Sequence, residues 1–100
     1  MNDHMTVARR FGRNLTVARK RTGMSQEEVG FRAGMNRAQI GVMERGERCP
    51  RIDTLVKLAA ALEVPITCPL LDGIGWRSAI AELGSFDASP SDVDEGSSDV

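Results

Sequence analysis

Residues 25–46 contain two helix start signals separated by a turn signal, and this spacing constrains the fold more than any other feature of the chain. Ser25 offers a hydroxyl N-cap with Glu28 three residues later, which is the spacing of a capping box. Gly34 allows the chain to turn after the first helix without steric cost, and Asn36 starts the second helix as its N-cap. The pattern predicts a helix-turn-helix, although a plain helical corner has the same spacing.

The N-terminal end of the second helix carries residue types that read DNA bases. Asn36, Arg37 and Gln39 cluster there. Arginine side chains pair with guanine, asparagine and glutamine side chains pair with adenine, and a helix N-terminus favours a phosphate group. This chemistry favours a DNA-binding helix at 36–45 over a corner without such a role.

The stretch from Phe11 to Leu71 resembles the lambda-repressor-like (Xre/Cro-type) helix-turn-helix domain of bacteria and their phages. The matching residues lie at separate points along that stretch: Leu15, Ala18, Arg19, Gly23, Met24, Ser25, Gln26, Val29, Gly34, Ile40, Met43, Glu44, Arg45, Gly46, Pro50, Leu55, Leu58, Ala59, Ala61, Leu62 and Val64. The resemblance implies an all-α, compact five-helix bundle at 6–71. It also implies a prokaryotic transcriptional regulator, a repressor that reads the major groove with helix 36–45.

The same resemblance implies roles for residues outside the second helix. Gln26 contacts a backbone phosphate and supports the recognition helix, and Arg19 and Glu44 form an ion pair between the first helix and the end of the recognition helix. The alternative for this pair is two solvated surface charges. Independently of the resemblance, Arg48 and Arg51 flank Pro50 in the loop before the fourth helix, a position suited to phosphate contacts, and a solvated loop is the alternative. The predicted DNA-binding residues are Gln26, Asn36, Arg37, Ala38, Gln39, Val42, Arg48 and Arg51.

Two glycines depart from the family pattern. Gly30 stands where the family usually has alanine, and Gly41 lies inside the recognition helix. Each costs about 0.5–1 kcal/mol of helix stability relative to alanine. We expect Gly30 to permit close helix packing and Gly41 to leave a bare patch on the surface that faces DNA. Base reading then rests on Arg37, Ala38 and Gln39, with Val42 available for a thymine methyl group.

Helical periodicity extends to both sides of this motif. Val7, Phe11, Leu15 and Ala18 predict the inward face of a helix at 6–22, and its basic residues (Arg9, Arg10, Arg13, Lys20 and Arg21) are expected on the other sides. A further helix is expected from Asp53 as its N-cap to about Leu62. A fifth short helix or turn is expected at 69–71.

The segment after residue 71 is predicted to be an extension followed by a tail. Trp76, Ala79, Ile80 and Leu83 have the spacing of a short amphipathic helix within 72–83, which would cap the core or make a dimer contact. Residues 84–100 are rich in Ser, Asp and Gly and are predicted to be a disordered acidic tail. No sheet is expected.

The charge is unevenly distributed along the chain. Residues 1–71 contain 12 Lys or Arg and 7 Asp or Glu, which gives +5, whereas residues 72–100 contain one arginine and 7 acids, which gives −6. A basic body with an acidic tail suggests a nucleic-acid partner despite the near-neutral total. The expected partners are double-stranded DNA and a second copy of the chain in a homodimer. The alternative function is an antitoxin that binds a toxin protein and also its own promoter.

Other functional classes find little support in the residues. The single histidine, His4, lies in the lead-in, so no histidine-based acid–base pair or metal cluster is expected, and no cofactor or enzymatic activity is predicted. Cys49 and Cys68 lack metal-site spacing. The chain has no apolar run of about 18 residues and no signal-peptide pattern, so a cytoplasmic location is expected.

Overall fold

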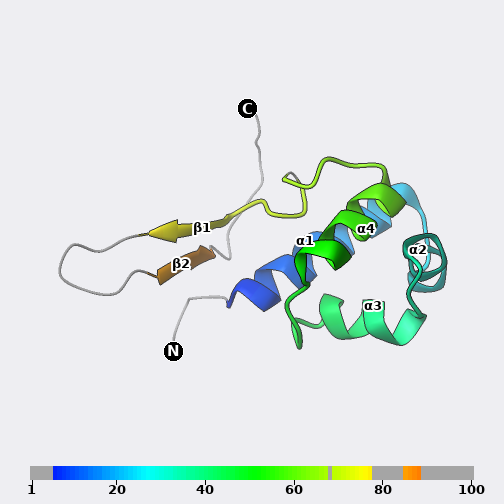
Figure 1. The fold of residues 1–100 in the computed structure, drawn as a ribbon, viewed down its shortest axis with the longest axis horizontal. Helices are drawn as coiled ribbons and strands as arrows, with labels where there is room; N and C mark the ends of the chain where they lie inside the picture. Colours follow the sequence, from blue (N-terminus) through cyan, green and yellow to red (C-terminus); the bar gives the residue numbers. More distant parts are fainter. Residues whose placement is uncertain (1–5, 68, 78–84, 89–100) are drawn as a thin grey trace.

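The structure, a computed structural model, describes residues 6–67, 69–77 and 85–88. Its elements in chain order are helices α1 (Val7–Thr22), α2 (Gln26–Ala33), α3 (Arg37–Glu44) and α4 (Ile52–Leu62), followed by strands β1 (Ile74–Arg77) and β2 (Ser85–Ala88). The four helices pack into one body, and the two strands lie at the opposite end of it from α2 (Figure 1).

The predicted helix boundaries around the turn motif are confirmed. The Ser25 hydroxyl accepts a hydrogen bond from the Glu28 amide at 3.0 Å, as an N-cap does. Gly23 and Gly34 end α1 and α2 in the left-handed conformation, with φ of +80° and +71°. Glycine adopts this conformation without a Cβ clash, which explains why both helices end at glycines.

The start of α4 differs from the prediction. Arg51 is the N-cap and makes no side-chain capping bond, so the prediction of Asp53 as the cap is wrong. Asp53 lies in the first turn, where its carboxylate accepts a hydrogen bond from the Thr54 amide at 2.9 Å. A carboxylate in that turn also interacts favourably with the helix dipole.

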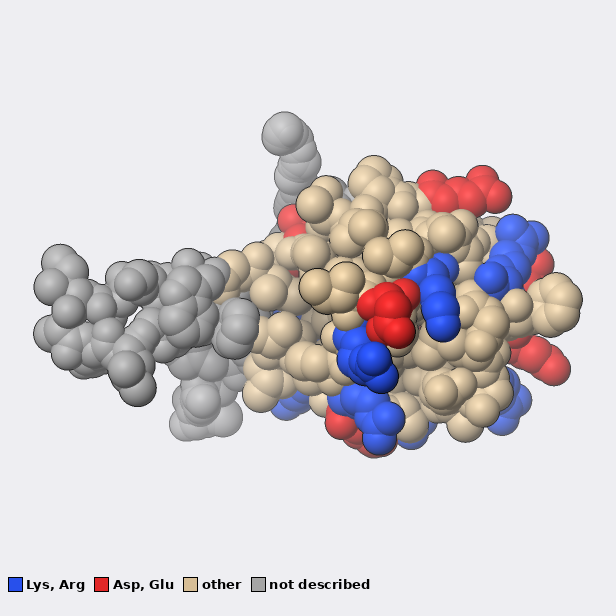
Figure 2. Space-filling model, in the orientation of Figure 1, with Lys and Arg blue, Asp and Glu red and all other residues tan. Residues whose placement is uncertain are grey.

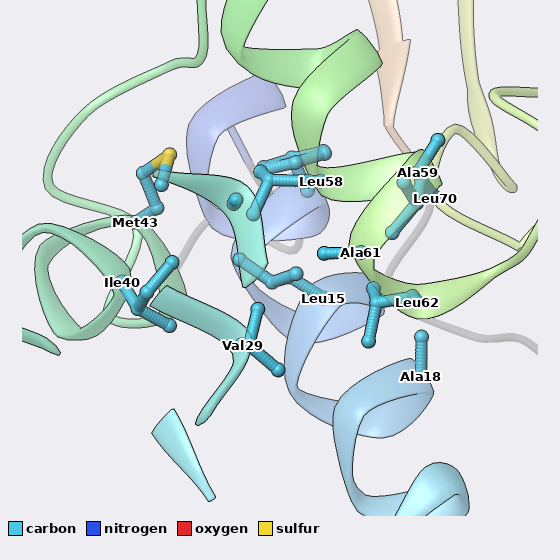
Figure 3. Close-up of a cluster of buried hydrophobic side chains, with 12 residues drawn as sticks. Leu15, Ala18, Val29, Ile40, Met43, Leu58, Ala59, Ala61, Leu62 and Leu70 are labelled. Atoms are coloured by element: carbon cyan, nitrogen blue, oxygen red, sulfur yellow. The ribbon is translucent and has the colours of Figure 1, made fainter. Parts of the chain in front are cut away.

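A single apolar core lies between the helices. Figure 3 shows its side chains converging from all four helices, together with Leu70 from the segment after α4. The buried members are Phe11, Leu15, Ala18, Val29, Ala33, Ile40, Met43, Leu58, Ala59, Ala61, Leu62 and Leu70. The inward face predicted for the first helix is therefore confirmed at Phe11, Leu15 and Ala18.

Between residues 69 and 73 the chain forms turns, so the expectation of a fifth helix in the bundle is wrong and four helices are present in the described residues. The side-chain amide of Asn14 donates hydrogen bonds through Nδ2 to the carbonyl oxygens of Leu70 and Asp72, both at 2.8 Å. Arg10 Nε donates to the same Asp72 carbonyl at 3.1 Å. Arg10 lies outside the predicted inward stripe, but it is only 5% exposed. The turns cover it.

The segment after Gly73 forms a strand instead of the predicted helix. Gly73 has a φ of +80°, which ends the turn, and β1 pairs with β2 in an antiparallel ladder with Trp76 opposite Phe86. β-branched and aromatic residues favour strands, and Gly75 weakens a helix. The expectations of a helix through Trp76 and of no sheet are therefore wrong.

The strand β2 also falls within the segment predicted to be disordered. Only residues 85–88 of that segment are described, and they are extended. Gly84 and residues 89–100 lie outside the described residues, as do the predicted helix positions Ala79, Ile80 and Leu83.

Candidate nucleic-acid interface

The start of α3 is held by a reciprocal pair of hydrogen bonds. The Asn36 side-chain oxygen accepts a hydrogen bond from the Gln39 amide at 2.9 Å, and the Gln39 side-chain oxygen accepts one from the Asn36 amide at 3.0 Å. This capping box satisfies two backbone donors at the helix N-terminus. It fixes the end of the helix at which the predicted base-reading residues lie.

The capping box also limits what these two side chains can recognise. Asn and Gln read adenine through one acceptor and one donor, but the oxygens of both side chains already accept backbone hydrogen bonds. Their NH₂ groups, with two donors each, take no part in the capping box. Asn36 and Gln39 are therefore better suited to donate to a phosphate or a base acceptor than to pair bidentately with adenine.

The exposed row of α3 contains most of the predicted reading residues and one that sequence reasoning missed. Arg37, Ala38 and Gln39 are exposed, and Val42 is half-buried. Arg45 is the C-cap, and helical spacing places it one turn beyond Val42 on the same row. Arg45 could have been found from the sequence, because Ala38, Val42 and Arg45 follow the i, i+4, i+7 spacing of one helix face.

Arg45 is paired with an acidic neighbour. Its Nε lies 2.9 Å from Glu47 Oε2, and its second terminal nitrogen lies 3.3 Å from Oε1. The hydrogen bonds and positive charge of Arg45 lower the pKa of Glu47, so this carboxyl is ionised at neutral pH. The pair is exposed and so contributes little to stability, but it partly neutralises the end of the α3 row.

Gly41 does not leave a bare patch, contrary to the prediction. It is buried, because side chains from two elements lie over it. A Cβ at this position would meet the Arg45 guanidinium at 3.1 Å and the Gln26 amide at 3.9 Å. The glycine therefore makes room for the Arg45 guanidinium, whereas the Gln26 amide lies at ordinary contact distance.

The predicted ion pair between Arg19 and Glu44 is present. Arg19 Nε lies 2.6 Å from Glu44 Oε2, and a second guanidinium nitrogen lies 3.1 Å from Oε1. The two side chains are only 13% and 7% exposed. Burial alone would raise the pKa of Glu44, but hydrogen bonds from Arg19 and Gln26, together with the charge of Arg19, lower it.

Gln26 joins this pair to the start of α2. Its amide nitrogen donates to Glu44 Oε1 at 2.9 Å. The second hydrogen of the same NH₂ group remains as a donor. Gln26 therefore supports α3 while keeping a donor for a ligand.

Two glycines allow the backbones to approach closely around α3. A Cβ on Gly12 of α1 would lie 2.3 Å from the Met43 carbonyl oxygen, and a Cβ on Gly30 of α2 would lie 2.7 Å from the Met35 oxygen. Real Cβ atoms do not approach backbone oxygens so closely. The expected close packing at Gly30 is present, and Gly12 is a determinant of the α1–α3 contact that sequence reasoning missed.

The loop after α3 adds exposed arginines. Arg48 and Arg51 are exposed, and the Arg51 side chain lies 3.7 Å from Asp53 Oδ1. Figure 2 shows Lys and Arg side chains along the lower half of the body, on the side where Figure 1 places α3, with some Asp and Glu among them. This face is rich in basic groups but is not uniformly positive.

The described residues were searched for metal-binding groups and membrane-spanning helices. No group of three or more His, Cys, Asp or Glu in them could hold a metal ion. No helix in the same part of the chain is long and apolar enough to cross a bilayer. Cys49 is exposed with a free thiol, whereas Cys68 lies outside the described residues.

Comparison with known proteins identifies the fold family. Residues 17–67 match the HTH_3 family, which is described as helix-turn-helix. This chain belongs to that family. The predicted resemblance to Xre-type, lambda-repressor-like regulators is therefore confirmed.

Similar members of the family are regulators by name. The chain is 38% identical over 60 residues to an uncharacterised HTH-type transcriptional regulator, y4dJ, of Sinorhizobium fredii (strain NBRC 101917 / NGR234), a match that covers 60% of this chain and 78% of that protein. The restriction-modification controller protein C.AhdI of Aeromonas hydrophila is similar in structure, with a TM-score of 0.58 and 36% identity over 59% of this chain and 89% of that one.

A solved complex with DNA is also among the similar structures. The P22 c2 repressor, crystallised with the synthetic operator 9T, has a TM-score of 0.54 and 26% identity, and the match covers 57% of this chain and 86% of the repressor. None of these three names concerns a toxin, so the antitoxin alternative stays a prediction.

Proposed function

We propose that this protein is a transcriptional regulator that binds double-stranded DNA sequence-specifically, with α3 in the major groove. The observation that carries the proposal is the row of exposed side chains on α3, held in place by a capping box at one end and by the Arg19–Glu44 pair at the other. A helix fixed at both ends presents its side chains in one arrangement, which base reading requires. The operator complex of the P22 c2 repressor supports repression as the mode of regulation.

The residues divide into two proposed roles. Arg37 lies at the exposed start of α3 and reads a base, guanine by its chemistry. Ala38 and Val42 offer methyl groups to thymine. Gln26 and the arginines of the following loop, Arg48 and Arg51, contact phosphates, which position the protein without carrying sequence information. Asn36 and Gln39 donate hydrogen bonds from their side-chain NH₂ groups to a phosphate or to a base acceptor.

Selection from a pool of random duplexes, followed by titration, tests these roles. Arg37→Ala is expected to cost about 1–3 kcal/mol on the selected site and to relax preference at one base pair. Gln26→Ala, Arg48→Ala and Arg51→Ala are expected to weaken the selected and a scrambled duplex equally. For the two arginines, the slope of log affinity against log salt should also fall by about one phosphate contact each.

Arg32→Ala is a matched control, because it removes an arginine that pairs with Glu28 on α2 instead of lying on α3. It should leave base preference unchanged. Equal losses on both duplexes for Arg37→Ala would show that Arg37 contacts only phosphate. Selection that enriches no sequence would contradict sequence-specific binding.

A further inference from the structure

In α3 and the segment after it, residues 36–48, four residues have side-chain oxygens that could accept a hydrogen bond from DNA: Asn36, Gln39, Glu44 and Glu47. The two amides are bound to each other's backbone at the start of α3. The Asn36 oxygen accepts a hydrogen bond from the Gln39 amide at 2.9 Å, and the Gln39 oxygen accepts one from the Asn36 amide at 3.0 Å. Turning either oxygen toward a base would break a capping bond.

The two carboxylates accept hydrogen bonds from arginines. Arg19 donates to both oxygens of Glu44, at 2.6 Å and 3.1 Å, and the Glu44 side chain is only 7% exposed. Arg45 donates to both oxygens of Glu47, at 2.9 Å and 3.3 Å. All four side chains with acceptor oxygens in residues 36–48 therefore have a donor within the protein.

The groups that the same stretch leaves for DNA are donors and methyl groups. Arg37 is an exposed guanidinium at the start of α3. The NH₂ groups of Asn36 and Gln39 take no part in the capping box, and each carries two donors. Ala38 is exposed and Val42 is half-buried, so their methyl groups complete the surface.

The four bases present different groups in the major groove. Guanine and thymine carry keto oxygens, and thymine also carries a methyl group, whereas adenine and cytosine carry amino groups. We propose that α3 reads guanine and thymine through their keto oxygens and methyl groups, and that it makes no hydrogen bond to the amino groups of adenine or cytosine. This inference rests on the proposed function and adds the class of sequence: a site with guanine or thymine at each position that α3 contacts.

Gln39 is the residue at which this inference departs from ordinary pairing between side chains and bases. A glutamine whose oxygen and NH₂ group both face adenine pairs with it through two hydrogen bonds. Here the oxygen holds the start of the helix, so the NH₂ group alone is offered to a base. A keto oxygen matches this donor, whereas cytosine offers only an amino group and is disfavoured most. The capping box thus sets base preference as well as helix stability.

Selection from random duplexes by the full wild-type chain and by Gln39→Glu tests the inference. Glutamate at this position keeps the capping box and replaces the NH₂ group by an oxygen, which accepts from the amino group of cytosine. We expect the two selections to differ at one base pair, where the wild type has guanine or thymine and the variant has cytosine on the same strand.

Titration of four duplexes that differ only at this base pair measures the change. The added charge should weaken binding of Gln39→Glu to all four, so the ratios between duplexes are compared. We expect the preference to change at least about tenfold, because each protein makes one hydrogen bond that the other lacks.

Gln39→Met is the matched control, because it is similar in size and has neither the oxygen nor the NH₂ group. It should lose the preference at that base pair without gaining one for cytosine. Adenine at that base pair in the wild-type selection, or an unchanged base preference in Gln39→Glu, would overturn the inference and leave sequence-specific binding intact. Selection that enriches no sequence would instead refute the proposed function and this inference with it.

Discussion

The guanidinium of Arg19 in α1 donates hydrogen bonds to both carboxylate oxygens of Glu44 in the last turn of α3, at 2.6 Å and 3.1 Å. The same guanidinium donates to the Met24 carbonyl at 3.1 Å. One side chain thus joins α1, the segment before α2 and the end of α3. This arrangement fixes the recognition helix against the body through hydrogen bonds that are directional as well as charged.

Loss of the Glu44 carboxylate should destabilise the protein in a pH-dependent way. Because Arg19 and Gln26 lower the pKa of Glu44 in the folded state, its contribution is present above the ordinary glutamate pKa of about 4.3 and is lost as the pH falls through the folded value. Glu44→Gln should cost about 3 kcal/mol at pH 7, since it leaves Arg19 buried without a counter-charge. Urea unfolding of the wild type and the Glu44→Gln variant at neutral and acidic pH measures this difference in the free energy of unfolding.

The difference between wild type and Glu44→Gln should shrink in acid. Arg19→Met leaves Glu44 buried without its counter-charge, so burial should raise the pKa of Glu44 and the stability should no longer fall as this carboxylate is protonated in acid. A difference that stays constant from neutral to acidic pH would show that the carboxylate charge does not stabilise α3.

Gly12→Ala should destabilise the fold although alanine favours helices. The added Cβ would meet the backbone oxygens of Met43 and Glu44 at 2.3 Å and 2.6 Å, so α1 and α3 must separate. We expect a net loss of about 1–3 kcal/mol in the free energy of unfolding. Gly41→Ala is the matched control, because its Cβ meets only the ends of two side chains, Arg45 at 3.1 Å and Gln26 at 3.9 Å, and no backbone atom. It should be neutral or stabilising by up to about 1 kcal/mol. Equal effects of the two changes would contradict the close approach.

Asn14→Ala should loosen the attachment of the segment that leads to β1. It removes the donor for the buried Leu70 carbonyl, and a buried carbonyl left without a partner costs about 1–3 kcal/mol, whereas the Asp72 carbonyl keeps its hydrogen bond from Arg10 Nε. Hydrogen exchange should rise most at residues 70–74. Thr22→Ala on the same helix is the control, because its exposed hydroxyl donates within α1 to the Arg19 carbonyl. An equal rise in exchange in both variants would show that Asn14 does not anchor this segment.

Glu47→Gln should strengthen DNA binding by the proposed regulator. The change frees Arg45 from its carboxylate partner at the end of the α3 row, so the salt slope should increase by about one phosphate contact. Titration of the selected and the scrambled duplex at two salt concentrations measures both effects. Glu63→Gln, on the C-cap of α4, removes the same charge elsewhere and should have a smaller effect. An unchanged slope would place Arg45 away from the phosphates.

Local signals made the helix-turn-helix predictable. Ser25, Gly34 and Asn36 act through hydrogen bonds and backbone conformations that involve only their near neighbours, so their roles follow from spacing. The apolar face of α1 was predictable for the same reason, because helical periodicity decides which residues face inward. The Arg19–Glu44 pair came from the family resemblance and not from spacing.

The sequence by itself determined the four helices, the caps at Gly23, Ser25, Gly34 and Asn36, and the residues of α1 that face the core, because each depends on interactions within a few positions of the chain. The tertiary structure decided which residues are buried or paired by contacts with other segments of the chain. Arg10 became buried because the turn at 70–73 covers it, and Gly41 became buried because Gln26 and Arg45 lie over it. Residues 74–77 formed a strand because residues 85–88 supply a ladder partner. Such contacts join residues from different segments of the chain, and the hydrophobic periodicity within one segment does not predict them.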